Sequence, residues 1–400
     1  MTGSVLFHVQ YLLGIGHLQR SLRIAEALVA EGVSVTLVSG GEPISGLRPH
    51  PGIRFVQLEP VRARDARFEL IDTAGNPIDD ALRARRRAAL LSAYDEAKPD
   101  AVVIEGFPFA RRAFRFEFDP LIAAVNQTRP RPRLVCSVRD IVIRRDDPTR
   151  LREIVQRVRS DFDAVLVHGD PDFVPFEASF PAAPEIADRL IYTGYVGSPS
   201  EAVGDNPTAP KNEVIVSGGG GPAGQALLRT ALEVRRQGCL ANLPWRILTG
   251  ATVSEPDFDA LVRGTNAGVR VERFRRDFPV LLRRCHVSVS QAGYNTVMDV
   301  LAAHARAVLV PFAAERETEQ LLRAEALAAR GVAEMVREGE LSPETLARAI
   351  ERAAARTPVL LALDTEGATC SARLIAAIIR AQKEAGPAFA AELRESIVRQ

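Results

Sequence analysis

The sequence predicts an α/β fold of two lobes, each a parallel sheet covered by crossover helices. Short β-branched runs bounded by glycine alternate with longer helical patterns, which is typical of such sheets. The alternation stops once, near the middle of the chain, and then restarts. The chain has 400 residues, of which 46% are hydrophobic, so it can fill two large cores.

The first lobe is expected over residues 1–196. Its first helix carries apolar residues at spacings of three and four, as in Leu18, Leu22, Ala25 and Leu28. The runs that read as strands are residues 5–10, 33–39, 53–58, 101–106, 134–139, 164–168 and 190–195. Strands and helices in this order indicate a Rossmann-like lobe.

Residues 197–212 form the expected linker, because they are rich in Gly, Pro, Ser and Asn and show no periodicity. The second Rossmann-like lobe is expected over residues 213–383, followed by a tail at 384–400. Its predicted strands are residues 213–217, 246–249, 269–274, 287–290, 307–311 and 332–336. The helical stretch 370–383 ends this lobe in our assignment, although its apolar residues would let it pack on either lobe.

Composition excludes several classes of function. Lys+Arg number 51 against 50 for Asp+Glu, so bulk charge does not indicate nucleic-acid binding. Lys98, Lys211 and Lys383 are the lysines, and none belongs to a Gly-Lys-Ser/Thr phosphate loop or a promising pyridoxal site. The four cysteines lack paired spacing, which predicts neither a zinc site nor disulfides and fits a reducing cytoplasm. No run of 18 apolar residues suggests a membrane span.

Two glycine clusters follow the first predicted strand of each lobe. Gly14-Ile15-Gly16-His17 opens the first helix, and the segment 218–222, four glycines and a proline, precedes a helix in the second lobe. Glycines there let the backbone approach an anion at a helix N-terminus. Neither cluster is a strict GxGxxG with a later acidic residue, which argues against a dinucleotide site.

A third strand-turn-helix segment, SQAGYNTVMD over residues 290–299, is more specific. Ala292 and Gly293 keep the turn slim, and Ser290 and Thr296 add hydroxyls, so the turn suits a diphosphate. Asp299 would reach ribose hydroxyls from the same helix. Glu319 and Gln320, on the next helix, offer the neighbouring carboxylate and amide that suit a sugar.

Together these segments resemble the two-lobed GT-B glycosyltransferases, of the branch containing the bacterial N-acetylglucosaminyltransferase that completes the lipid-linked peptidoglycan precursor. The resemblance is strongest over residues 218–331. GIGHLQRSLRIAEAL, SVRDI, VHGDP and YTGYV resemble, more closely still, a group of bacterial predicted glycosyltransferases. The resemblance implies two lobes facing each other across a cleft and an enzyme that moves a sugar from a nucleoside-diphosphate-sugar donor to an acceptor hydroxyl.

The resemblance also implies a donor site in the second lobe. The donor diphosphate would lie against two loops, Asp299 would hold the ribose, Glu319 and Gln320 the transferred sugar, and backbone at Phe274 and Arg275 the base. The loop residues concerned are Gly218, Gly219, Gly220, Gly221, Ser290, Ala292, Gly293, Asn295 and Thr296. Asp299 stands where the family usually has glutamate, and the Glu-Gln pair is more often Gln-Gln or Asp-Gln, so the donor's base and sugar stay open.

Inverting transfer needs a base for the acceptor hydroxyl, and His17 is the candidate. Glu105, at a predicted strand end, could orient it, although a simple strand-end acid is the plainer reading. Arg20, with Gly14 and Gly16, would contact the acceptor or a phosphate. Asp170 and Asp172 follow a strand but lie outside the donor lobe, so we predict metal-independent transfer without a cofactor beyond the donor.

Residues 107–118 hold five phenylalanines and three arginines, Arg111, Arg112 and Arg115. They are either a membrane-surface patch for a lipid-linked or anionic acceptor, or an apolar helix face with solvated arginines. The expected location is therefore the cytoplasm, with peripheral contact at the inner membrane face as an option.

Two alternatives to transfer remain open. A related two-lobed family of nucleotide-sugar hydrolases carries a Gly-x-Gly-His-x-x-Arg loop, which Gly14, Gly16, His17 and Arg20 match. The arginine-rich first lobe slightly favours transfer. A catalytically silent sugar-nucleotide or glycan-binding protein is the third hypothesis.

Overall fold

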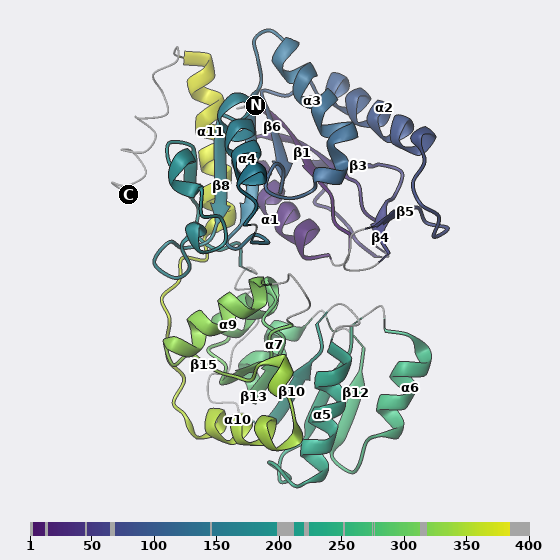
Figure 1. Cartoon of the computed structure of the whole chain (residues 1–400), viewed down its shortest axis with the longest axis vertical. Helices are drawn as coiled ribbons and strands as arrows, with labels where there is room; N and C mark the ends of the chain where they lie inside the picture. The colour runs from purple at the N-terminus through teal and green to yellow at the C-terminus, as the bar shows by residue number, and fades with distance from the viewer. Residues whose placement is uncertain are drawn as a thin grey trace. The chain divides into compact units, whose positions relative to one another are not determined.

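The structure is a computed structural model that describes residues 3–12, 15–44, 46–64, 69–144, 146–197, 212–219, 224–250, 253–273, 275, 277–312 and 318–384. It divides into two compact units (Figure 1). Unit 1 comprises Met1–Val196 and Leu363–Gln400, and unit 2 comprises Gly197–Ala362. The expected linker at 197–212 lies almost wholly outside the described residues.

Unit 1 is built on a seven-stranded parallel sheet in the order β3-β2-β1-β6-β7-β8-β9. Its strands are β1 (Ser4–Val9), β2 (Ser34–Ser39), β3 (Ile53–Gln57), β6 (Ala101–Glu105), β7 (Arg133–Arg139), β8 (Ala164–His168) and β9 (Leu190–Tyr192). The predicted strands are found here, each within a few residues of its expected ends. A small antiparallel hairpin, β4 (Arg62–Ala63) with β5 (Leu70–Ile71), was not predicted.

Helices cover both faces of this sheet. Along β6, Val102 and Ile104 face one apolar core, while Ala101 and Val103 face the other. The helices are α1 (Gly16–Ala30), α2 (Asp80–Ala97), α3 (Arg115–Gln127), α4 (Pro148–Asp161) and α11 (Gly367–Glu384), with short 3-10 turns η1 (Arg112–Phe114), η2 (Phe176–Ala178) and η3 (Ala183–Ile186).

The last helix, α11, corrects the expected boundary of the second lobe. Its residues Leu374, Ile375 and Ile379 are buried in the same core as α1, and α11 runs beside the unit 1 sheet (Figure 1). Val196 pairs with Glu366 in an antiparallel bridge where the chain returns. Residues 363–383 therefore belong to unit 1, because their apolar face completes the core over α1.

Unit 2 repeats the arrangement with a six-stranded parallel sheet in the order β12-β11-β10-β13-β14-β15. Its strands are β10 (Glu213–Ser217), β11 (Trp245–Leu248), β12 (Val269–Glu272), β13 (Cys285–Ser290), β14 (Ala307–Leu309) and β15 (Ala333–Met335). Its helices are α5 (Gln225–Arg236), α6 (Glu255–Arg263), α7 (Phe278–Arg284), α8 (Tyr294–Ala302), α9 (Glu319–Ala329) and α10 (Pro343–Ala355), with the 3-10 turn η5 (Glu338–Glu340).

Candidate functional site

The strand order of each unit fixes where a ligand site can form. In doubly wound parallel sheets, ligands bind beyond the carboxyl ends of the strands, where the strand order reverses. That point lies between β1 and β6 in unit 1 and between β10 and β13 in unit 2. His17 and Glu105 follow the first pair of strands, and the two predicted donor loops follow the second.

In unit 1 the structure brings three predicted residues together. Glu105 ends β6 and is buried, while His17 and Arg20 lie one turn apart at the start of α1. The Nδ1 atom of His17 is 2.6 Å from Glu105 Oε1, and an Arg20 guanidinium nitrogen is 2.5 Å from the same oxygen. The Glu105 carboxylate is thus held between an imidazole and a guanidinium.

Burial sets the charge states of this pair. The pKa of His17 is lowered to about 4, chiefly by burial, with smaller contributions from the charges of Arg111 and Arg20 and an opposing effect of Glu105. Burial alone would raise the pKa of Glu105, but its interactions with His17, including the hydrogen bond, and the charges of Arg20 and Arg111 hold that pKa well below its usual range. At neutral pH the site therefore contains a neutral imidazole beside an ionised carboxylate.

The tautomer of His17 follows from this contact. A carboxylate only accepts hydrogen bonds, so the Nδ1–H of His17 donates to Glu105. The Nε2 atom is then the proton acceptor of the ring. His17 is 24% exposed at its side chain, compared with 1% for Glu105, so the imidazole is the accessible member of the pair.

Arg20 is a partner of the Glu105 carboxylate. It is only 2% exposed and bonds Glu105, and its expected contact with the acceptor or a phosphate stays a prediction. Gly16 is the first residue of α1, and Gly14 lies outside the described residues.

The phenylalanine-arginine segment 107–118 is mostly interior, which favours the apolar helix face over the membrane-surface patch. Phe107, Phe109, Phe114 and Phe118 are at most 3% exposed and belong to one apolar core. Phe116 packs against that core. The segment therefore fills the space between the sheet and α3 instead of presenting an apolar face.

In unit 2 the turn after β13 has an open helix N-terminus. Gly293 is the N-cap of α8, and no side chain caps this end. A Cβ added at Gly293 would meet nothing within 4 Å, so space adjoins the turn. Ser290, the last residue of β13, has a buried hydroxyl with no hydrogen-bond partner among the described residues. Asn295 and Thr296 lie in the first turn of α8, and Asp299 lies half-buried farther along.

Gln320 and Glu319 support this turn from α9. The Gln320 side-chain oxygen accepts hydrogen bonds from the backbone N–H groups of Ala292 and Phe312, each at 3.1 Å. Glu319 is 5% exposed and accepts a 2.9 Å hydrogen bond from Arg323.

Arg323 is a site residue that sequence reasoning missed. It is fully buried and also donates to the Ala292 carbonyl at 2.9 Å, so it restrains the turn between β13 and α8. Its spacing of four residues from Glu319 was the available signal.

The glycine loop after β10 is described in part. Gly219 has φ +72°, and a Cβ there would lie 2.8 Å from the Gln291 side-chain oxygen. A Cβ at Gly224 would lie 2.1 Å from the Gly218 carbonyl oxygen, so only glycine lets α5 start this close to the end of β10. Gly220 and Gly221 lie outside the described residues.

The predicted base pocket is also described in part. Arg275 forms a bidentate pair with Asp277 at 2.7 and 2.8 Å and bonds Glu272 at 2.9 Å. Its guanidinium is thus committed to carboxylates, which leaves its backbone as the group that could face a base. Phe274 lies outside the described residues.

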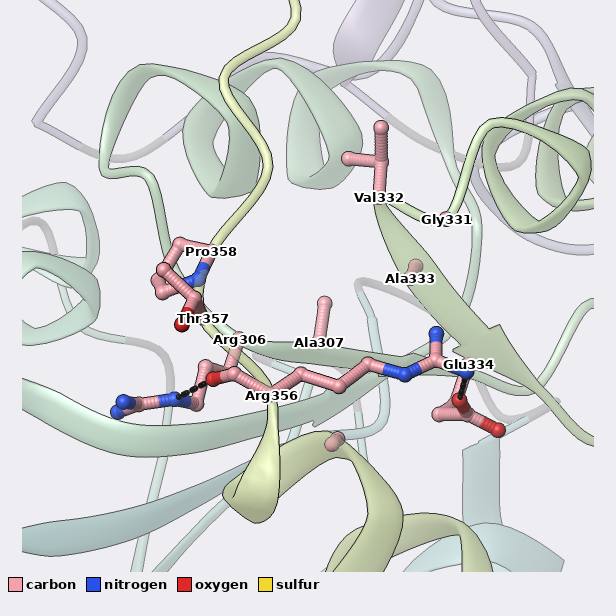
Figure 2. A pocket seen from close by; sticks show the side chains of 10 residues that line it. Arg306, Ala307, Gly331, Val332, Ala333, Glu334, Arg356, Thr357 and Pro358 are labelled. Carbon is pink, nitrogen blue, oxygen red and sulfur yellow. Dashed lines mark hydrogen bonds and ion pairs between the residues drawn. The ribbon is translucent and has the colours of Figure 1, made fainter.

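A shallow hollow lies at the opposite edge of the unit 2 sheet, beside the first residues of β14 and β15 (Figure 2). Arg356 reaches across it to Glu334 at 2.6 Å, and Arg306 donates to the Arg356 carbonyl at 2.6 Å. Its charges satisfy one another, and it lies away from the switch point.

In the described part of the chain, no group of three or more His, Cys, Asp or Glu side chains is placed to hold a metal ion. None of the helices described is long and apolar enough to cross a membrane.

Comparison with known families matches residues 214–377 to the glycosyltransferase family 28 C-terminal domain. The chain is 28% identical over 348 residues to the UDP-N-acetylglucosamine--N-acetylmuramyl-(pentapeptide) pyrophosphoryl-undecaprenol N-acetylglucosamine transferase of Phenylobacterium zucineum, covering 84% of this chain and 86% of that protein. The Brucella canis enzyme of the same name is 36% identical over 83 residues, 21% of this chain and 22% of its own length.

Solved glycosyltransferase structures have the same fold. The kitacinnamycin glycotransferase matches with a TM-score of 0.58 at 17% identity, covering 95% of this chain and 97% of its own. Acinetobacter baumannii MurG matches with a TM-score of 0.55 at 18% identity, covering 99% and 100%. The calicheamicin glycosyltransferase CalG4 matches with a TM-score of 0.56 at 18% identity, covering 100% and 98%.

Proposed function

We propose that His17 is the general base of this chain, which is a glycosyltransferase with the GT-B fold and a family 28 C-terminal domain. It moves a sugar from a nucleoside-diphosphate-sugar donor to an acceptor. The observation that carries the assignment of His17 is its 2.6 Å contact with the buried Glu105 at the switch point of unit 1.

The proposed step is a single displacement. The acceptor hydroxyl gives its proton to Nε2 of His17 while its oxygen forms a bond to the anomeric carbon of the donor sugar. The bond from that carbon to the diphosphate oxygen breaks, and the nucleoside diphosphate leaves with the electron pair. Attack opposite the leaving group inverts the anomeric centre. Glu105 stabilises the imidazolium that forms, because its carboxylate already accepts the Nδ1–H.

Arg20 is a positioning residue in this proposal. It donates to the same carboxylate oxygen as His17 and is buried, so it restrains the side chain of Glu105. It also keeps Glu105 ionised, since the Arg20 charge lowers the pKa of that carboxyl.

The donor is proposed to bind at the carboxyl edge of the unit 2 sheet. The uncapped N-terminus of α8 and the buried Ser290 hydroxyl offer hydrogen-bond donors to a diphosphate. Asp299 would hold the ribose, and the Gln320 amide nitrogen would face the sugar, since its oxygen already binds two backbone N–H groups. The contacts of Glu319, of the loop 218–221 and of the backbone at 274–275 with the donor stay predictions.

A uridine diphosphate sugar is the proposed donor, because the named relatives use UDP-N-acetylglucosamine. Their acceptor is linked to undecaprenol by a pyrophosphate, which supports a lipid-linked acceptor and work at the inner face of the membrane. We also propose transfer without a metal ion, with the α8 amides and dipole stabilising the leaving diphosphate.

The test is nucleoside-diphosphate release from UDP-, GDP- and dTDP-sugars, with water alone and with a panel of hydroxyl acceptors. We expect acceptor-dependent release from a UDP-sugar that survives chelation of divalent metals. The His17→Ala variant should lose about 10²–10⁴-fold in turnover while keeping its Kd for UDP. His50→Ala, at an exposed histidine of the same unit, is the matched control.

Three outcomes would contradict the proposal. Fast release with water alone would indicate hydrolysis, full turnover of His17→Ala would remove the base, and rescue by manganese after chelation would show metal dependence.

A further inference from the structure

Arg111 lies beside His17 and Glu105, and the proposed mechanism gives this cation no role. It lies on the loop after β6, whose last residue is Glu105. A Cβ added at Gly106, next to Glu105, would lie 3.6 Å from Cγ of Arg111, so the arginine stem packs on the backbone of the site. Its charge acts on both His17 and Glu105.

Among the described residues, the Arg111 guanidinium has no hydrogen-bond partner and no carboxylate within ion-pair distance, and its Nε atom is buried without one. Three arginines that are buried show the usual arrangement. Arg20 pairs with Glu105, Arg86 with Glu117, and Arg323 with Glu319. Arg111 itself is of intermediate exposure, with its Nε atom buried. A guanidinium that is partly removed from water without such a partner costs stability, because its desolvation is not offset.

The backbone of Arg111 is also strained. Its φ is +61°, in the left-handed region that residues with a Cβ seldom adopt. Strained residues of this kind persist where the surrounding structure holds them, and they cluster at ligand sites. The loop is held by the Ala110 N–H to Gly106 carbonyl bond of 2.7 Å and the Phe114 N–H to Arg111 carbonyl bond of 2.9 Å.

We propose that Arg111 binds an oxyanion carried by the acceptor, of the phosphate or carboxylate class, beside the hydroxyl that His17 deprotonates. This rests on the proposed function of the His17–Glu105 pair. His17 and Arg20 both contact Oε1 of Glu105. The other carboxylate oxygen, Oε2, has no hydrogen-bond partner among the described residues and is not bonded by Arg111, so the Arg111 guanidinium keeps its donors for a ligand. An acceptor phosphate would supply the two or more oxygen atoms that a guanidinium fork binds best.

The experiment measures binding of methyl phosphate to the full chain, by calorimetry and by ³¹P chemical shift, with the donor site saturated by UDP. Arg111→Asn removes the charge and suits the left-handed backbone, and Arg111→Lys keeps the charge. Arg112→Asn is the matched control, since Arg112 is the next residue and its side chain is 62% exposed. We expect Arg111→Asn to weaken methyl phosphate binding at least about tenfold, Arg111→Lys less, and Arg112→Asn not at all.

Thermal melting separates this role from a structural one. If Arg111 serves a ligand, Arg111→Asn should melt at the same temperature as the parent chain or higher, because an unpaired, partly desolvated charge and backbone strain are both relieved. A large loss of thermal stability with unchanged methyl phosphate affinity would overturn the proposal. Arg111→Lys provides a second check. If the charge of Arg111 is only structural, Arg111→Lys should recover the thermal stability lost in Arg111→Asn, and neither variant should change phosphate binding.

Two further measurements are needed. One distinguishes an acceptor phosphate from the donor diphosphate, and the other distinguishes failure of the Arg111 proposal from failure of the His17 proposal. A weaker Kd for UDP in Arg111→Asn, with methyl phosphate binding unchanged, would place the guanidinium on the donor diphosphate and overturn the acceptor assignment. In His17→Ala, methyl phosphate binding should persist. A fully active His17→Ala variant would defeat the proposed base and still leave the phosphate measurement to decide the role of Arg111.

Discussion

In unit 1 the switch point of the sheet is filled by polar and charged side chains that contact one another, whereas in unit 2 it presents backbone and small residues. His17, Glu105 and Arg20 form the first arrangement, and the turn at Gly293 with the uncapped α8 forms the second. Both sheets run in the same relative strand order. The topology therefore supplies a place for a site, and side-chain chemistry decides what that place can do.

The difference follows from what each site is proposed to handle. Proton transfer needs one side chain held in one tautomer, which a buried carboxylate ensures. Diphosphate binding needs several N–H groups and free space, which a helix N-terminus beside glycine provides. Side-chain substitutions should therefore damage unit 1 most, and an added Cβ should damage unit 2 most.

The largest effect is expected from Glu105→Gln. Loss of the carboxylate frees the tautomer of His17, so turnover should fall about 10²–10⁴-fold. It also removes the buried partner of Arg20, at a cost of about 3–5 kcal/mol in the free energy of unfolding. Turnover assays and urea denaturation measure the two effects. Glu96→Gln, which breaks a surface pair with Arg54, should cost less than about 1 kcal/mol and leave turnover intact. Equal effects of both variants would refute a special role for Glu105.

Two glycines of unit 2 sharpen the other half of the comparison. Gly224→Ala forces a Cβ against the Gly218 carbonyl and should destabilise the chain by about 1–3 kcal/mol. The methyl group of Gly293→Ala meets no atom of the described chain within 4 Å, so the free energy of unfolding should change by less than about 0.5 kcal/mol. The Kd for UDP should rise about tenfold, because the new methyl group enters the space proposed for the ligand. Thermal melts and UDP calorimetry test both. UDP binding unchanged by Gly293→Ala would mean that the donor lies elsewhere.

The pH dependence of unit 1 should be small over the usual range. Because the pKa of His17 is lowered to about 4, the imidazole is neutral and able to accept a proton from pH 5 upward. The pH profile of kcat/KM should be flat between about pH 5 and 8 and should fall tenfold per pH unit below about 4. An acidic limb centred near pH 6.5 would show that His17 is not desolvated in the free enzyme.

The lowered pKa of His17 also makes the free energy of unfolding depend on pH. The folded chain binds the His17 proton less readily than the unfolded chain, so the free energy of unfolding should decline as pH falls from about 6.5 towards 4. Circular dichroism at each pH keeps acid unfolding separate from loss of activity.

The smallest effect is expected at Arg112. Since the phenylalanines of segment 107–118 are interior, Arg112→Glu should change retention of the protein on anionic vesicles by less than about twofold at physiological salt. Co-sedimentation with vesicles measures this. Retention that disappears with Arg112→Glu would restore the surface-patch hypothesis for this segment.

Much of the fold could be predicted because strand signals are local. The runs around Val5, Val103 and Val287 are β-branched and end at turn residues, so residue pattern and turn residues together locate these strands. The position of α11 could not be predicted in this way. Its apolar face matches any core of the right width, and only packing against α1 decides.

The site could be predicted in part. Glycine turns and His17 carry local signals, whereas burial does not. Arg20 was predicted to contact the acceptor or a phosphate, and Arg323 was not singled out; the structure buries both against carboxylates. Arg111 was singled out only as one of the arginines of segment 107–118, because the sequence shows neither its left-handed backbone nor its missing partner.

The return of the chain to unit 1 affects how the protein is made. Unit 2 is a continuous segment, 197–362, so it can fold as soon as it leaves the ribosome. Unit 1 must wait, because the apolar face of α1 stays uncovered until residues 367–384 are synthesised. Unit 1 begins first in the sequence but is completed last. A chain truncated after residue 362 would have a complete unit 2 attached to an incomplete, aggregation-prone unit 1.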